Sequence, residues 1–234
     1  MSIPRKHTQS PIVTGTSVIA LKYADGVLMA ADTLGSYGSL ARFTDNRRLL
    51  SVHDTTLIGG SGDFSDFQFL TDELEKMEIN DFTLDDGCDL TSPEVYNYLQ
   101  RLFYHRRNKM DPLWNSLVIG GLHPATKKPF LGSVNMIGMA FEDDFIATGF
   151  GHHFAMPLLR QHWKASMTLD EARTLLENCM RICFYRDCRS LNRIQFATVT
   201  AEGTTINEPI ALSTKWDFQS FVNPKAGVET GGSW

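Results

Sequence analysis

The feature that most constrains the fold is a repeated change of hydrophobic period along the chain. Short apolar or alternating runs, typical of β-strands, are interrupted twice by a pair of stretches in which apolar residues recur every three or four positions, as in amphipathic helices. Paired helices between blocks of hairpins predict an α+β fold, a four-layer sandwich of two antiparallel sheets with a helical layer outside each. The strand-like runs are 16–23, 27–34, 48–53, 55–60, 116–122, 130–141, 145–148, 195–201 and 204–212, and the helical stretches are 64–77, 91–109, 152–163 and 168–183.

Local signals mark where several of these elements turn or begin. Asp25-Gly26 separates the first two apolar runs and is a turn signal typical of a hairpin. The segments 91–94 and 168–171 each begin with threonine and end with glutamate, which is the capping-box pattern of a helix N-terminus. We therefore expect a hairpin at the start of the chain and two well-defined helix starts.

Length and charge restrict the class of protein. The chain has 234 residues, with 22 Lys and Arg against 27 Asp and Glu, so its net charge is −5. This balance argues against a nucleic-acid binder, and the basic run 101–109 is better read as a helix end or a subunit contact. No stretch approaches the ~20 apolar residues of a membrane span. We expect one domain at 16–212, a lead or propeptide remnant at 1–15 and a C-terminal extension at 213–234.

Two groups of residues raise the question of a metal site. His152, His153 and His162 have no cysteine or carboxylate at a ligand spacing, and adjacent histidines on a helix point in different directions. Cys179 and Cys183 are one helical turn apart, but both fall on the apolar stripe of their helix. We therefore predict no metal site, and we expect these two thiols to pack in the core.

The dipeptide Gly15-Thr16 carries more chemical information than these groups. A threonine can act as a nucleophile when it is the first residue of a chain, because its own α-amino group then serves as the base. Such chemistry at Thr16 requires removal of everything up to Gly15. Read alone, the dipeptide is better explained as a strand start after a flexible glycine.

Three separated segments, however, resemble the successive motifs of proteasome beta subunits, in that family's order. The resemblance extends from Thr8 to about Leu212, and it implies the N-terminal nucleophile hydrolase fold. Further stretches are similar to one non-catalytic type within the family. The three motif segments are 15–32, 60–66 and 185–190, and the further stretches are 8–16, 34–42 and 107–115.

The resemblance implies roles for five residues that this chain retains. Active members have the nucleophilic threonine directly after a glycine, and Thr16 fills that position. Asp32 corresponds to the aspartate that orients a catalytic lysine, and Gly62 to the glycine of the oxyanion hole. Asp187 and Ser190 match the late aspartate and serine of the family.

Two positions depart from the pattern of active members. Arg48 stands where the lysine is expected, and a guanidinium does not exchange its proton as an amine does. Phe150 replaces a serine that supports the α-amino group and a water. We expect this ring to be packed, so that its removal costs ~3 to 5 kcal/mol. Both losses affect proton handling, so Thr16 is expected to be inert.

The resemblance therefore implies a non-catalytic structural subunit of the 20S core particle, with a degenerate site and no cofactor. It implies partners among the alpha and beta subunits of a 28-subunit particle, including the opposite beta ring, and residence in cytoplasm and nucleus, without nucleic acid or membrane. Cleavage is expected between His7 and Thr8. The alternative is an active threonine protease subunit that matures at Gly15-Thr16, and a free-standing binding protein of this fold is a weaker one.

The C-terminal extension is unusually aromatic for a chain terminus. Trp216, Phe218 and Phe221 lie in a segment without helix or strand periodicity, and large aromatic residues dominate interface energetics. The resemblance implies an arm that reaches the opposite ring. The other interpretation is that residues 216–221 only cover this subunit's own outer strand.

Overall fold

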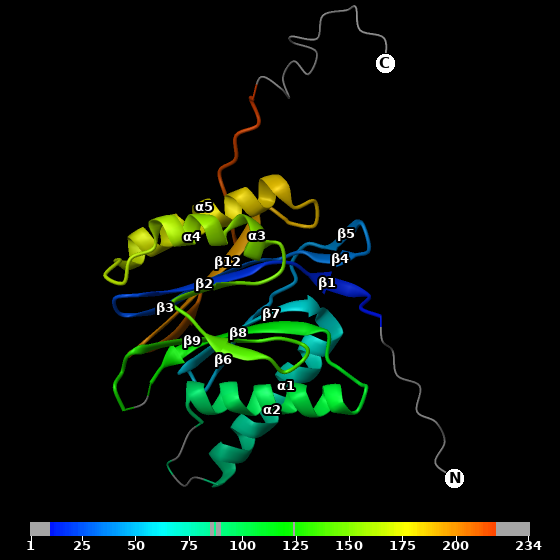
Figure 1. The fold of residues 1–234 in the computed structure, drawn as a ribbon, viewed down its shortest axis with the longest axis vertical. Helices are drawn as coiled ribbons and strands as arrows, with labels where there is room; N and C mark the ends of the chain where they lie inside the picture. Colours follow the sequence, from blue (N-terminus) through cyan, green and yellow to red (C-terminus); the bar gives the residue numbers. More distant parts are fainter. Residues whose placement is uncertain (1–9, 85–86, 88–89, 124, 219–234) are drawn as a thin grey trace, which may run out of the picture.

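The structure is a computed structural model that describes residues 10–84, 87, 90–123 and 125–218. Two antiparallel sheets pack face to face, and helices cover the outer face of each (Figure 1). This arrangement confirms the α+β sandwich that the sequence predicts.

The first sheet has eight strands, and seven of them follow the order β10-β9-β8-β7-β1-β4-β5, while β6 also pairs with β7. The register brings Gly15 of β1 opposite Gly62 of β7. The strands are β1 (Val13–Gly15), β4 (Gly35–Tyr37), β5 (Leu40–Phe43), β6 (Leu49–Val52), β7 (Thr56–Asp63), β8 (Asn115–Leu122), β9 (Pro129–Val134) and β10 (Ala140–Glu142).

The second sheet has six strands, in the order β11-β2-β3-β12-β13, with β14 also paired to β12. The hairpin of β2 and β3 turns at the predicted Asp25-Gly26, with Tyr23 opposite Gly26. The strands are β2 (Val18–Tyr23), β3 (Gly26–Asp32), β11 (Phe145–Ala147), β12 (Arg193–Thr200), β13 (Gly203–Ile206) and β14 (Ile210–Ala211).

Helices α1 (Phe64–Leu84) and α2 (Ser92–Asn108) cover the eight-stranded sheet. Helices α3 (Gly151–Phe154), α4 (Met156–His162) and α5 (Leu169–Arg186) cover the six-stranded one (Figure 1). The capping boxes at Thr91 and Thr168 both form, each with the glutamate carboxylate accepting the N-cap N–H. No helix in the described part of the chain has both the length and the apolar character needed to cross a membrane.

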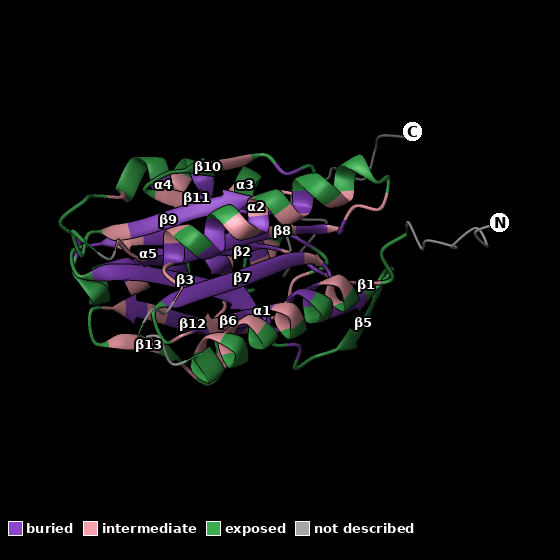
Figure 2. Cartoon of the chain, turned by 90° about the horizontal axis from the view of Figure 1, so that it is seen from below, coloured by how far each residue is buried: buried purple, intermediate pink, exposed green. Residues whose placement is uncertain are grey.

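Three apolar clusters fill the spaces between the four layers. One lies between the sheets and includes Val18, Met29 and Val118. A second joins the six-stranded sheet to α4 and α5, and a third joins the eight-stranded sheet to α1 and α2. The central strands β2, β3, β7, β8 and β9 are accordingly mostly buried, as Figure 2 shows in purple.

The structure divides three elements that the sequence predicts as single runs. The 130–141 run becomes β9 and β10, because the Asn135 carboxamide accepts the backbone N–H groups of Ile137 and Met139 and turns the chain. The 152–163 helix becomes α3 and α4, with Pro157 in the first turn of α4. The 204–212 run becomes β13 and β14.

The sequence also missed three strands and underestimated one helix. Strands β1, β4 and β5 have three or four residues each, too few to show a period. Helix α1 continues beyond the predicted end at residue 77 to Leu84. Its last buried side chain is Leu74, so the final turns carry no apolar stripe that could have predicted them.

Candidate functional site

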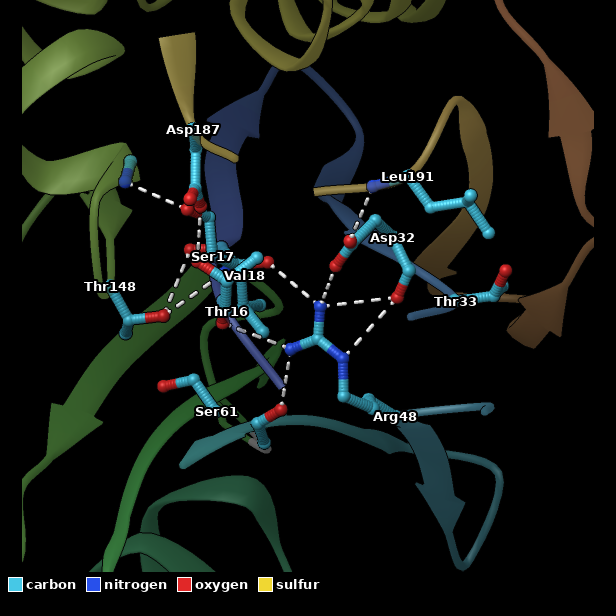
Figure 3. A network of polar contacts seen from close by, with 12 residues as sticks. Thr16, Ser17, Val18, Asp32, Thr33, Arg48, Ser61, Thr148, Asp187 and Leu191 are labelled. Carbon is cyan, nitrogen blue, oxygen red and sulfur yellow. Dashed lines mark hydrogen bonds and ion pairs between the residues drawn. The ribbon is translucent and has the colours of Figure 1, made fainter. Parts of the chain in front are cut away.

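The centre of the candidate site is the buried guanidinium of Arg48, which is only 2% exposed. It lies against the carboxylate of Asp32 and also donates to the Asp32 carbonyl at 3.1 Å (Figure 3). Further N–H groups donate to the carbonyls of Thr16 at 3.1 Å, Ser17 at 3.1 Å and Gly60 at 2.9 Å. The planar guanidinium of one side chain therefore donates to all of these oxygen atoms, a geometry that a lysine ammonium cannot reproduce.

These contacts join the two sheets at one end of the sandwich. Asp32 ends β3 in the six-stranded sheet, and Ser17 directly precedes β2 of the same sheet. Arg48 directly precedes β6, and Gly60 lies within β7 of the eight-stranded sheet. Arg48 thus cross-links the sheets through a charged pair and three backbone carbonyls outside that pair.

The second carboxylate oxygen of Asp32 also has a hydrogen-bond partner. Its Oδ2 atom accepts the backbone N–H of Leu191 at 3.1 Å, from the loop that follows α5. Burial raises the pKa of the Asp32 carboxyl, while the Arg48 guanidinium and the Leu191 N–H oppose the rise. The structure therefore places Asp32 and Arg48 in direct contact.

Two glycines next to Thr16 are required by close packing. A Cβ on Gly15 would overlap the Arg48 side chain. Gly62 has a φ of +99°, in the region that favours glycine, and a Cβ there would overlap the carbonyl oxygen of Trp114. Gly62 pairs with Gly15 across β7 and β1, so this predicted site residue lies beside Thr16.

The hydroxyl of Thr16 faces the end of α5. Its Oγ1 donates to Oδ2 of Asp187 at 2.7 Å (Figure 3). Asp187 is the C-cap of α5 and is 5% exposed, and its Oδ1 accepts the Arg189 N–H at 2.9 Å. Ser190 is close by through its backbone, with its N–H donating to the Asp187 carbonyl at 3.3 Å. The late aspartate therefore contacts Thr16 directly, and the late serine is linked to that aspartate through its backbone.

Phe150 lies near Thr16, but the prediction that its ring is packed is wrong. The side chain is 51% exposed and stacks on Phe154 with 6.2 Å between ring centroids. Phe150, Thr16 and Gly62 line the same cavity of about 270 Å³. The ring sits at the N-cap of the four-residue α3, at the molecular surface, where few side chains are available to cover it.

Further residues hold the site together that the sequence analysis did not single out. Ser17 Oγ accepts the Gly151 N–H at 2.7 Å, and Thr148 Oγ1 accepts the Val18 N–H at 3.0 Å. Asp63 accepts the Ile12 N–H at 2.9 Å and also the Ser65 N–H at the start of α1. An aspartate immediately before an amphipathic helix is a usual N-cap signal, and it could have identified Asp63.

No group of three or more metal-ligating side chains occurs among the residues that the structure describes. Cys179 and Cys183 are free and buried in the core beneath α5, as predicted. Burial raises the pKa of each of these two thiols to about 12. They therefore act as small apolar side chains.

The predicted interface residues of the extension are only partly described. Trp216 and Phe218 are about half exposed, at 48% and 49%, and Phe221 lies outside the described residues. The Trp216 ring packs edge-on against Tyr185 of α5 at 5.0 Å, and the Lys215 N–H donates to the Tyr185 hydroxyl. The extension thus begins against its own subunit's helix rather than against its own outer strand.

Comparison with known proteins agrees with these motifs. The family model described as "Proteasome subunit" matches residues 12–199. The chain is 48% identical to proteasome subunit beta type-4 of Arabidopsis thaliana, over 98% of this chain and 92% of the relative. It is 43% identical to proteasome subunit beta type-4 of Xenopus laevis, over 94% and 91%. It is also 40% identical to proteasome subunit beta type-7 of Saccharomyces cerevisiae, over 92% and 85%. The chain therefore belongs to the proteasome subunit family, as a beta subunit of the kind that these relatives represent.

Proposed function

We propose that this beta subunit is a non-catalytic, architectural component of the 20S core particle. It completes the inner beta ring and helps to join the two rings, while other subunits perform the proteolysis. The observation that carries the proposal is the set of hydrogen bonds that the Arg48 guanidinium makes. All of its hydrogen bonds are to the Asp32 carboxylate and to backbone carbonyls, and none is to the Thr16 hydroxyl.

Chemistry at Thr16 needs a group that accepts and returns a proton near the hydroxyl. A guanidinium does not release its proton at physiological pH, so Arg48 cannot replace the lysine of active members. The position of the supporting serine is also taken by Phe150, whose ring lines the cavity beside Thr16. The degenerate positions Thr16, Asp32, Arg48, Gly62, Phe150, Asp187 and Ser190 therefore keep the shape of a threonine protease site without its proton handling.

The retained lead is part of the same proposal. We expect cleavage between His7 and Thr8, which lie outside the described residues, so that Thr16 remains peptide-bonded. Pairing of β1 with both β4 and β7, together with the Ile12 to Asp63 hydrogen bond, supports a lead that is part of the sheet. A peptide-bonded Thr16 lacks the free amine that the mechanism requires.

The alternative function is an active threonine protease subunit that matures at Gly15-Thr16. One observation favours it, because the Thr16 hydroxyl already donates to Asp187 and Gly62 lies beside it. In either case the subunit assembles with other proteasome subunits. We further propose that these are the alpha and beta subunits of the 20S core, in cytoplasm and nucleus, and that the extension at 213–234 reaches the opposite ring.

A covalent threonine-directed inhibitor separates the two functions. Purified particles that contain this chain are treated with the inhibitor, and each subunit is analysed by mass spectrometry. We expect labels on other beta subunits, which serve as the internal positive control, and an unlabelled chain here. A label on Thr16 would establish the protease function instead.

A further inference from the structure

The hairpin of β4 and β5 ends the eight-stranded sheet and projects from the side of the molecule (Figure 1). Its outer strand, Leu40–Phe43, is exposed at all four residues, and Figure 2 shows it in green. The outer edge of β5 has no strand partner among the residues that the structure describes. Such an edge presents backbone N–H and C=O groups to any extended chain that meets it.

A β-bulge places the apolar side chains of this hairpin on one face. Cross-strand partners share a face, and Tyr37 pairs with Leu40 while Gly35 pairs with Phe43. Tyr37 and Gly35 are two residues apart and also share a face. Leu40 and Phe43 are three apart and would ordinarily point to opposite faces. The register shift makes Arg42 the extra residue and brings both onto the Tyr37 face.

The resulting apolar patch, made of Tyr37, Leu40 and Phe43, is open to solvent. These side chains are 55%, 55% and 47% exposed. Aromatic residues are enriched at the centres of protein interfaces, and exposed apolar patches on ordered strands mark interaction sites. The patch is preformed, because two paired strands hold its members.

Arg42 adds an unneutralised positive charge beside the patch. Its guanidinium carbon lies 5.8 Å from the centre of the Phe43 ring. No carboxylate lies within ion-pair distance of Arg42 in the described part of the chain. Arg47, by contrast, forms ion pairs with Asp45 and Glu208. Arg193 also forms an ion pair with Asp45.

We propose that the β4–β5 hairpin docks an extended apolar segment of a neighbouring proteasome subunit, which adds to the outer edge of β5 and presents a carboxylate to Arg42. The open edge selects an extended segment, and the patch selects apolar side chains at alternate positions. The free guanidinium selects a carboxylate, its best-matched anionic partner in proteins. This inference rests on the proposed architectural function, since it identifies a surface by which the subunit joins its ring.

Photo-crosslinking in assembled particles tests the docking directly. Phe43 is replaced by p-benzoylphenylalanine in the full chain, and irradiated particles are analysed by mass spectrometry. We expect a crosslink to an acidic, apolar segment of one neighbouring subunit. A crosslink confined to this chain's own extension, to peptide substrate, or to no protein would overturn the inference.

Charge reversal gives an independent test with a matched control. Arg42→Glu is expected to lower incorporation of the chain into particles roughly tenfold, the scale of a lost interfacial charge pair. Arg160→Glu, at an exposed arginine of α4, makes the same charge change away from the hairpin and should leave incorporation unchanged. Replacing the crosslinked acidic residue of the neighbour by lysine should then restore incorporation of the Arg42→Glu chain.

The docking inference and the architectural function can fail separately. If Arg42→Glu and Leu40→Ser chains enter particles as well as the wild-type chain does, the docking inference is wrong while the architectural function stands. If the wild-type chain is absent from particles, the architectural function itself fails.

Discussion

The side chain of Arg48 occupies the space that a methyl group on Gly15 would need. A Cβ built on Gly15 would overlap Cδ of Arg48 and lie 2.7 Å from its Nε. By resemblance to active family members, the glycine before the threonine would belong to a cleavage site. In this chain the packing of Arg48 gives the glycine a structural reason to be present.

The first prediction follows from this contact. Gly15→Ala should destabilise the chain by ~1 to 3 kcal/mol, because an added methyl group overpacks the site. The cost should fall in an Arg48→Ala background, where the overlapping side chain is gone. Gly26→Ala is the matched control, since its Cβ would overlap the Val199 carbonyl and its cost should not depend on Arg48. Urea unfolding of the three single and two double variants measures the coupling, and equal costs of Gly15→Ala in both backgrounds would refute it.

The second prediction concerns the cross-link between the sheets. Arg48→Met should reduce the free energy of unfolding by ~3 to 5 kcal/mol, because it leaves the buried Asp32 carboxylate without its charged partner. Arg47→Met removes the neighbouring arginine, whose partner Glu208 is at the surface, and should have no measurable effect. Thermal unfolding of both variants checks this. Similar losses for the two would show that burial of Arg48 is not what matters.

The third prediction separates the two departures from the family pattern. Phe150→Ser should change stability by less than ~1 kcal/mol, because the ring is half exposed and stacks only on Phe154 among the described aromatic side chains. Arg48→Lys should assemble poorly, because one ammonium cannot reach the carbonyls of Thr16, Ser17 and Gly60 together. The double variant should assemble like Arg48→Lys alone, without peptidase activity at Thr16. Normal assembly with hydrolysis would mean that these two substitutions alone explain inactivity.

The fourth prediction uses the buried thiols. Because burial raises the pKa of Cys179 and Cys183 to about 12, almost none of either is thiolate at pH 8, and the reactive fraction grows only as the pH rises toward that value. Cys188 is exposed in the chain. Iodoacetamide at pH 8 should therefore modify Cys188 in the native full chain and reach Cys179 and Cys183 only after unfolding. Prompt modification of Cys179 would contradict its burial.

The fifth prediction concerns the C-terminal extension. Truncation after Leu212 keeps the apolar core, because Leu212 is the last residue buried in the cluster beneath α5. It removes Trp216 and Phe218 from Tyr185. We expect a folded subunit that enters half-particles but joins two halves poorly, which native gel electrophoresis can follow. A normal yield of double-ring particles with unchanged heat stability would limit the extension to local cover.

The layer order and most elements could be predicted because they depend on periodicity, which each segment carries in itself. The paired helices and the β2–β3 hairpin are examples, with Leu70 and Leu74 on the buried face of α1. Strand β1 could not be predicted in this way, since its pairing depends on Tyr37 and Gly62, distant in sequence. Breaks such as the Asn135 turn depend on one side chain and are invisible to a window of apolar residues.

The candidate site, like the fold, could be predicted only in part from the sequence. The resemblance located Thr16, Asp32, Arg48 and Asp187, and the fold links them into one network through the backbone carbonyl of Thr16. The environment of Phe150 was wrongly predicted, because residue type says nothing about how much of the chain is available to cover a ring at a short helix start. The β4–β5 patch was also missed, since it arises from a bulge in the strand register.

The intact mass of this chain from assembled particles tests the central claim most directly. A non-catalytic Thr16 that remains peptide-bonded predicts a mature chain that begins at Thr8, or elsewhere upstream of Gly15. The catalytic subunits of the same particles serve as the control, because their masses should correspond to chains that begin at a threonine. A mass for this chain that begins at Thr16 would contradict the account.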